Sequence, residues 1–234
     1  MSFFKWLGST DLFPLWNSIR IAAVSCLLVF FLGIFFAYYA AKLPRSVKGV
    51  LDVILTLPLV LPPTVCGYLL LLVFGVNHPI GAFLANHGLQ VPFTVLGGIL
   101  AALVVSFPLM YRTARGAFES FDKNLAYAGQ TLGLTNTYIF WRIRMPACRQ
   151  GILAGTVLAF ARALGEYGAT SMLIGYKPGY TATISTTVYM LWKSDTPEND
   201  QLAMNWVLVN LAISTVVLLT VNLLEARQKK AVKA

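Results

Sequence analysis

The sequence predicts an all-α membrane protein with five transmembrane helices, the N-terminus outside and the C-terminus in the cytoplasm. Hydrophobic residues make up 57% of the 234 residues and charged residues only 12%, which is about half the charged fraction of a typical soluble domain. The mean hydropathy is +0.70. Five apolar stretches are long enough to cross a hydrocarbon core of about 30 Å, and most of the charges lie between them.

The five stretches are residues 15–41, 50–76, 91–112, 151–175 and 203–224. The first resembles a signal peptide in its position, but its apolar run is longer than a typical signal core. No basic segment directly precedes it either. We therefore expect it to be a retained span.

The orientation follows from the distribution of lysine and arginine. Thirteen of these residues lie on one predicted side and three on the other, and the more basic side of a membrane protein is cytoplasmic. The thirteen are Lys42, Arg45, Lys48, Arg112, Arg115, Lys123, Arg142, Arg144, Arg149, Arg227, Lys229, Lys230 and Lys233, and the three are Lys5, Lys177 and Lys193. The net charge of +9 is thus explained by topology, and no nucleic-acid partner is predicted.

The second stretch contains three prolines within the sequence TLPLVLPPTVCGYLLLLV, namely Pro58, Pro62 and Pro63. Each proline removes a backbone donor, and an adjacent pair breaks a helix. Broken backbone at membrane depth is tolerated where protein buries it or where it lines a cavity. Two interpretations stay open: a simple kink packed against other helices, or a helix that borders a pathway, with Pro62 and Pro63 at its gate.

The fourth stretch carries two opposite charges, Arg162 and Glu166. Their spacing of four predicts one helix face and mutual neutralisation. Charges at membrane depth usually face the interior of a bundle or an aqueous route. A structural ion pair and a gate or anion path are both compatible with the pattern. On the same helix, Gly151 and Gly155 form a G-x-x-x-G pattern that permits close helix approach.

No metal or cofactor site is predicted. His78 and His87 have no third ligand near them, and the three cysteines lack ligand spacing. They are Cys26, Cys66 and Cys148. The two outer loops, residues 77–90 and 177–200, are long enough for small interfacial helices.

Residues 120–148 form an amphipathic, basic segment between the third and fourth stretches. Asp122 is a good N-cap and Gly133 a good residue just after a helix end, which predicts one short helix over residues 123–132. A second helix is expected over residues 135–144, ending before Pro146.

The first of these two helices carries an apolar stripe, formed by Leu125, Ala128 and Leu132. An apolar stripe outside the membrane is unfavourable in water unless another surface covers it. Either the protein's own helix ends or a docked partner would supply that surface, and a plain interfacial linker is the remaining alternative.

This segment resembles the cytoplasmic loop of bacterial ABC importer permeases. Their usual pattern is Glu-Ala-Ala, three residues, Gly, nine residues, and Ile-x-Leu-Pro. The chain keeps the glycine-to-isoleucine spacing but has Tyr127 for the acidic residue, Gly129 for the second alanine and Met145 for the leucine. Because the acidic residue is absent, two interpretations stay open: an acidic contact with the partner is lost here, or another residue makes it. By this resemblance residues 127–136 carry the coupling helix, and the residues that couple to the ATPase are Tyr127, Ala128, Gly129, Gly133, Leu134, Ile143 and Pro146.

Three further segments are similar to molybdate importer permeases: LPLVLPPTVCGYLLL, SFPLMYRTARGAFE and GTVLAFARALGEYGAT. Sulfate permeases share a looser form of the last one. The resemblance covers about residues 21–174 and implies a fold of the type I ABC importer permease, with residues 1–234 as one transmembrane domain. It also implies a homodimer in the bacterial inner membrane, a cytoplasmic ATPase dimer, and an extracytoplasmic binding protein that delivers the oxyanion.

The expected function is therefore that of a permease subunit for molybdate, with tungstate or sulfate as the alternative substrate. The chain has no G-x-x-x-x-G-K-[ST] phosphate loop and no cluster of catalytic residues, so it is not expected to hydrolyse ATP itself. Two other classes remain as alternatives. An ion-coupled secondary transporter usually shows inverted repeats, which we do not find here, and a membrane-bound enzyme would need a catalytic or metal cluster.

Overall fold

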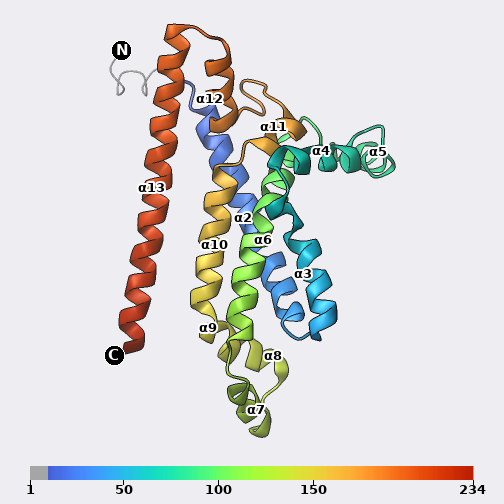
Figure 1. The fold of residues 1–234 in the computed structure, drawn as a ribbon, viewed down its shortest axis with the longest axis vertical. Helices are drawn as coiled ribbons and strands as arrows, with labels where there is room; N and C mark the ends of the chain where they lie inside the picture. Colours follow the sequence, from blue (N-terminus) through green and yellow to red (C-terminus); the bar gives the residue numbers. More distant parts are fainter. Residues whose placement is uncertain (1–9, 234) are drawn as a thin grey trace.

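The structure is a computed structural model that describes residues 10–233, with side chains described for residues 10–220. Within this part of the chain all regular elements are helical. Three helices form the central bundle: α2 (Phe13–Ala40), α6 (Val95–Glu119) and α10 (Arg149–Leu164). Each of the three helices packs against the other two (Figure 1).

Small residues allow the three helices to approach closely at Met110 of α6, which is fully buried. A Cβ atom on Gly33 of α2 would lie 2.5 Å from Met110 Cγ, and one on Gly155 of α10 would lie 2.9 Å from Met110 Sδ. A Cβ atom on Gly151 would lie 2.6 Å from Ala117 Cβ. Both glycines of the G-x-x-x-G pattern therefore face α6, which confirms the predicted close approach.

The second and fourth predicted spans are not continuous helices. The stretch 50–76 is divided into α3 (Arg45–Val60) and α4 (Pro63–Phe74), with a bend of 111° between their axes. The cause is local, because Leu61 and Pro62 adopt extended conformations at the Pro-Pro pair. The stretch 151–175 is divided into α10 and α11 (Gly168–Ile174).

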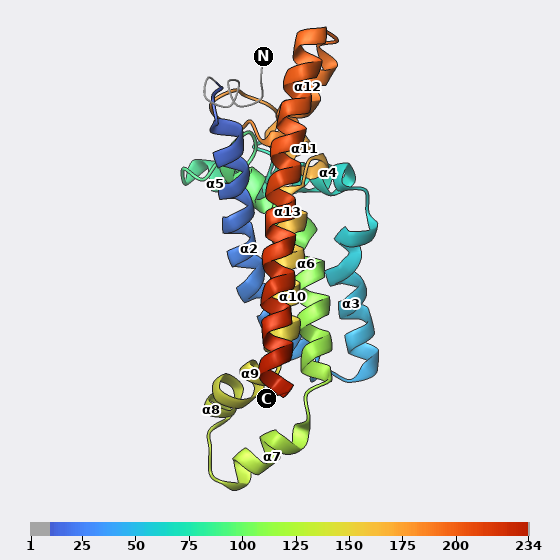
Figure 2. The same cartoon turned by 90° about the vertical axis from the view of Figure 1, so that its left-hand side faces the viewer.

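Among the described residues, three helices are long and apolar enough to cross a membrane. They are α2, α6 and the part Pro197–Thr220 of α13 (Pro197–Lys233), and the bent pair α3–α4 would count as a fourth. Helix α10 has only 16 residues. It nevertheless runs through the bundle between α6 and α13 (Figure 2).

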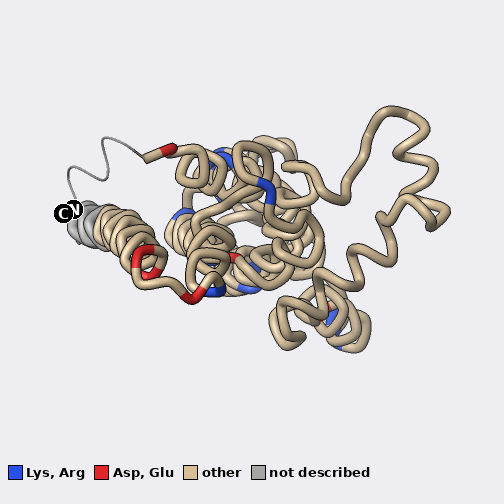
Figure 3. The backbone as a smooth tube through the Cα atoms, turned by 90° about the horizontal axis from the view of Figure 1, so that it is seen from above, with Lys and Arg blue, Asp and Glu red and all other residues tan. Residues whose placement is uncertain are grey.

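The two outer loops each contain the predicted small helix, α5 (Pro79–Asn86) and α12 (Ile184–Lys193). Both lie at one end of the molecule together with α4 and α11 (Figure 1). Seen from that end, most positions along the chain are neither basic nor acidic residues (Figure 3). The opposite end holds the connection from α2 to α3 and the segment after α6.

The segments predicted to be cytoplasmic thus lie together at one end, as the charge pattern requires. Which side of a membrane this end faces stays a prediction. Lys5 lies outside the described residues, and so do the side chains of Arg227, Lys229, Lys230 and Lys233.

Candidate coupling loop and pathway segment

The segment after α6 begins with helix α7 (Lys123–Thr131). Its N-cap is Asp122, whose Oδ1 accepts a hydrogen bond from the backbone N–H of Asn124 at 2.9 Å. Gly133 follows the helix end with φ +76°. The N–H of Gly133 donates to the carbonyl of Gln130 at 2.9 Å, and the N–H of Leu134 donates to the carbonyl of Gly129 at 3.0 Å. These two bonds define a Schellman ending. Together with the Asp122 bond they confirm both predicted caps of α7.

The second helix of the loop begins as predicted but does not end before Pro146. The Thr135 hydroxyl accepts from the N–H of Tyr138 at 3.3 Å and caps α8 (Asn136–Ile139). A π-helical turn, η1 (Phe140–Arg144), then leads into α9 (Met145–Ala147). Pro146 sits in the first turn of α9, where a missing N–H is tolerated, so the helical path bends instead of stopping.

The two parts of the loop are joined by an apolar contact. A Cβ atom on Gly129 would lie 3.1 Å from Cγ1 of Ile139 and 3.4 Å from Cδ1 of Ile143. Ala126, one turn earlier on α7, is also buried. The structure therefore brings two motif residues together, Gly129 and Ile143, and a Cβ atom at Gly129 would fit only if the neighbouring isoleucine side chains shifted slightly.

The other face of α7 is uncovered in the single chain. Leu125 is 49% exposed, Tyr127 59% and Leu132 78%, and Ala128 is exposed as well. The predicted apolar stripe is thus displayed at the end of the molecule and is not covered by the protein's own helix ends. Displayed apolar surface of this kind is typical of a protein–protein contact.

The loop is fixed to the bundle where α9 meets α10. The Cys148 thiol donates to the carbonyl oxygen of Ala117 near the end of α6, with Sγ and O at 3.3 Å. Burial raises the pKa of the Cys148 thiol above its usual value, which favours the protonated form that donates this hydrogen bond. Phe118 and Ile152 belong to the same buried cluster. The ends of α6 and α10 therefore hold the loop as one unit.

The predicted ion pair exists, but its setting differs from the prediction. Arg162 Nη1 and Glu166 Oε2 lie 2.6 Å apart, yet α10 ends at Leu164 and the pair bridges the break beyond it. Glu166 Oε1 also accepts a hydrogen bond from the N–H of Ala169 at 2.7 Å, in the first turn of α11. The Glu166 side chain is 1% exposed and that of Arg162 29%. The pair therefore joins two helices instead of lying on one helix face.

The break in the second stretch lies beside the break in the fourth. A Cβ atom on Gly168 would lie 2.8 Å from Pro63 Cβ, and one on Gly67 would lie 2.8 Å from Ala169 Cα. Helices α4 and α11 are therefore in backbone contact. The structure brings Pro63, and with it the Pro62 turn, next to the segment that follows Glu166. The residues predicted to couple to an ATPase lie at the other end of α6 and α10 (Figure 1).

A charged cluster that was not predicted from the sequence links α3 to α6. Asp52 accepts a hydrogen bond from the hydroxyl of Tyr111 at 2.5 Å and contacts the guanidinium of Arg115. Lys48 Nζ and Glu119 Oε1 lie 2.8 Å apart. Helix α3 has no fully buried residue, and these polar contacts add to the packing of its partly buried Leu51 and Leu55 against the core. The available signal was the position of Asp52 and Arg115 at the edges of apolar runs.

Comparison with known proteins identifies the class. The model of the family described as "Binding-protein-dependent transport system inner membrane component" matches residues 30–230. This match covers most of the chain, and the chain belongs to this family. It is an integral membrane protein of the permease type.

Individual relatives share most of the length of the chain. It is 41% identical over 211 residues to the molybdenum transport system permease protein ModB of Escherichia coli K12, covering 88% of this chain and 91% of that protein. It is 37% identical over 214 residues to ModB of Haemophilus influenzae, covering 91% of this chain and 93% of that protein.

Solved structures show the same fold. A chain of a bacterial alginate ABC transporter, in complex with its pentasaccharide-bound periplasmic protein, superposes with a TM-score of 0.76 at 19% identity, covering 97% of this chain and 83% of that chain. A chain of an amino acid ABC transporter superposes with a TM-score of 0.67 at 18% identity, covering 97% of this chain and 99% of the other. The fold is therefore that of ABC importer permeases.

Proposed function

We propose that the chain is the permease subunit of an ATP-driven importer that carries molybdate into the cytoplasm. The observation that carries the proposal is the 41% identity to a molybdenum transport permease over 88% of the chain. A loop with the capped coupling-helix geometry at one end of the bundle supports it. The whole chain, residues 1–234, would act as one transmembrane domain.

The proposed complex contains two copies of this chain in the bacterial inner membrane, a cytoplasmic ATPase dimer and an extracytoplasmic molybdate-binding protein. Too few helices surround any axis of one chain to enclose a hydrated path, and a two-fold dimer is the simplest closed arrangement. The positive-inside rule supports placing the coupling loop and the C-terminus in the cytoplasm and the N-terminus outside.

The proposed mechanism is alternating access driven through α7. The exposed face around Tyr127 and Leu132 would seat on the ATPase, and ATP-driven closure would draw the two α7 helices together. Because Cys148 and the buried cluster around it fix the loop to α6 and α10, the motion would pass along these helices to the broken segments at their other end. Such coupling requires two arrangements that ATP and the binding protein bias together.

The residues proposed for the pathway or its gate are Pro62, Pro63, Arg162 and Glu166. They belong to two adjacent helix breaks, and broken backbone at membrane depth is typical of segments that line a route. Glu166 offsets the charge of Arg162, so the pair would not hold an anion tightly. A weak site is what release into the cytoplasm requires.

Uptake into proteoliposomes tests the proposal. The permease is co-purified with its ATPase, ATP is enclosed, and loaded binding protein is added outside. We expect ATP-dependent molybdate uptake that tungstate competes with and that sulfate inhibits only weakly. Uptake of sulfate in preference to molybdate would reassign the substrate. Uptake driven by an ion gradient without ATP would contradict the importer mechanism and support a secondary transporter.

A further inference from the structure

A cavity and a groove meet at the end of the molecule that carries the coupling loop. The basic cavity, of about 820 Å³, lies between the α2–α3 connection and the loop, and its lining includes Lys42, Lys48, Lys123 and Arg144. The aromatic groove, of about 460 Å³, runs along α2 and the second half of the loop. Tyr38, Asn136 and Phe140 line both spaces, so the cavity and the groove adjoin at these residues.

The basic cavity carries positive charge that the chain does not neutralise. It is lined by four cations and one carboxylate, Glu119, which is paired with Lys48. Lys42, Lys123 and Arg144 have no ion pair with any described residue. An anionic ligand would therefore find uncompensated charge here.

Aromatic rings hold two of these cations at the junction with the groove. Lys42 Nζ lies 3.8 Å from the centroid of the Tyr38 ring. The guanidinium carbon of Arg144 lies 5.3 Å from the Tyr38 centroid and 4.9 Å from that of Phe121. The Nε of Arg144 is buried without a hydrogen-bond partner in the part of the chain that the structure describes. Both cations are thus positioned but keep donors for a ligand.

The aromatic groove has the polarity and the length for an acyl chain. Phe31 is 60% exposed, Phe35 55% and Trp141 59%, and all three line the groove. From Phe30 to Tyr38 the groove follows about 12 Å of helix, close to the depth of about 15 Å of one leaflet. The aromatic residues at its cationic end are of the kind that gathers at the membrane interface.

We propose that this site binds an anionic phospholipid, with its phosphate between Lys42 and Arg144 and an acyl chain in the aromatic groove. Charge complementarity selects the headgroup, and the continuous apolar groove selects a lipid over a free oxyanion. Basic pockets beside transmembrane helices at the cytoplasmic surface are typical sites for such headgroups. The bound lipid would fasten α2 to η1 and so stiffen the attachment of the coupling loop. The proposal does not depend on which anion is transported.

Quenching of tryptophan fluorescence by brominated lipids tests the proposal. The full-length permease is placed in phosphatidylcholine nanodiscs that contain a minor fraction of either brominated phosphatidylglycerol or brominated phosphatidylcholine. Trp141 is one of five tryptophans, and its signal is obtained as the difference from Trp141→Phe. We expect brominated phosphatidylglycerol to quench Trp141 more strongly than the phosphatidylcholine form does.

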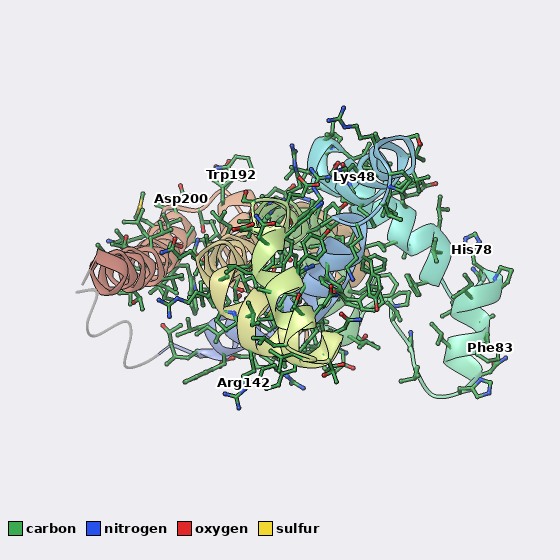
Figure 4. All side chains as sticks on the ribbon, turned by 90° about the horizontal axis from the view of Figure 1, so that it is seen from below. Lys48, His78, Phe83, Arg142, Trp192 and Asp200 are labelled. Carbon is green, nitrogen blue, oxygen red and sulfur yellow. The ribbon has the colours of Figure 1, made fainter. Side chains whose placement is uncertain are left out.

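Arg142 supplies the matched control, because it belongs to the same π-helical turn as Arg144 but lines neither space. Seen from this end, it projects from the edge of the molecule, far from Lys48 (Figure 4). We expect Arg144→Gln and Lys42→Gln each to weaken the phosphatidylglycerol preference about fivefold. Arg142→Gln should leave it unchanged. Lys42→Gln keeps the test valid if Arg144→Gln does not fold.

Four results would overturn the proposal. Equal quenching by both brominated lipids would show no headgroup selection, and an equal loss in Arg142→Gln would show general surface attraction. If inorganic phosphate removed the preference of the wild type, the ligand would be a free oxyanion. If Trp141→Phe left the quenching of the protein unchanged with either lipid, another protein surface would cover the groove.

Discussion

The proposed coupling loop, residues 120–148, and the two broken spans both depend on glycine, but in opposite ways. Gly133 in the loop has φ +76°, and no atom lies within 4 Å of the position that a Cβ atom would take there, so its role is conformational. Gly67 and Gly168 at the breaks lie against backbone atoms, so their role is to leave space. The loop is therefore shaped by signals within a few residues of sequence. At the breaks, the Pro62–Pro63 pair interrupts the helix locally, whereas the packing of α4 on α11, which lie far apart in the chain, needs the space that glycine leaves.

The largest effect is expected at the contact between α4 and α11. In Gly67→Ala the new Cβ would lie 2.8 Å from Cα and O of Ala169 and from Cβ of Met172. We expect a loss of about 3 kcal/mol of stability, the upper end of the cost of overpacking. Thermal unfolding of the purified permease would measure it.

Gly116→Ala is the control, since Gly116 is also helical and has nothing within 4 Å of a Cβ atom. It should be neutral or stabilising by up to about 1 kcal/mol. Equal melting temperatures for the two variants would show that α4 and α11 are not in close contact.

A smaller effect is expected from Glu166→Gln. The glutamine keeps an oxygen for the N–H of Ala169 but leaves Arg162 without its counter-charge. Because the Arg162 side chain is 29% exposed, we expect a loss of about 2 kcal/mol, less than for a fully buried pair. The double variant Arg162→Met with Glu166→Gln should recover part of this loss in a thermal unfolding series. Strictly additive changes would mean that the two charges do not interact.

A local change in the loop should have the smallest effect on stability. Asp122→Ala removes the oxygen that accepts from the N–H of Asn124, and the loss of an N-cap costs about 1 kcal/mol. Asp122→Ser keeps a capping oxygen and should lie near the wild type. Hydrogen exchange of the α7 amides would report the change, which should be confined to this helix. Faster exchange throughout α6 and α10 would contradict a local role.

The same contrast explains what could be predicted from the sequence. Asp122, Gly133 and the spacing of the motif predict α7 because caps act on groups in adjacent turns. The Pro62–Pro63 pair predicts a disturbance but not its angle of 111°. That angle depends on where α4 can pack against α11.

Other features could not be predicted because they depend on contacts between distant parts of the chain. The end of α10 before Glu166 has no proline to mark it, so the sequence predicted one helix through residues 151–175. The pairing of Asp52 with Tyr111 and Arg115 joins residues about sixty positions apart. No pattern within a single helix reveals such a partner. The helical course through Pro146 was missed because Pro146 lies in the first turn of a new helix, where proline is tolerated.

The central claim is that the segment 120–148 transmits the work of an ATPase to the bundle. Gly133→Pro tests it, because proline cannot adopt φ +76° and lacks the N–H that donates to Gln130. Gly88→Pro is the matched control in an outer loop, where Gly88 has φ +77° and donates to the carbonyl of Ala85.

The measurement is ATPase activity in proteoliposomes, with and without molybdate-loaded binding protein, for the wild type and both variants in assembled complexes. We predict that the binding protein stimulates the wild type and Gly88→Pro but not Gly133→Pro. Stimulation of Gly133→Pro to the wild-type level would contradict the assignment of this loop as the coupling element.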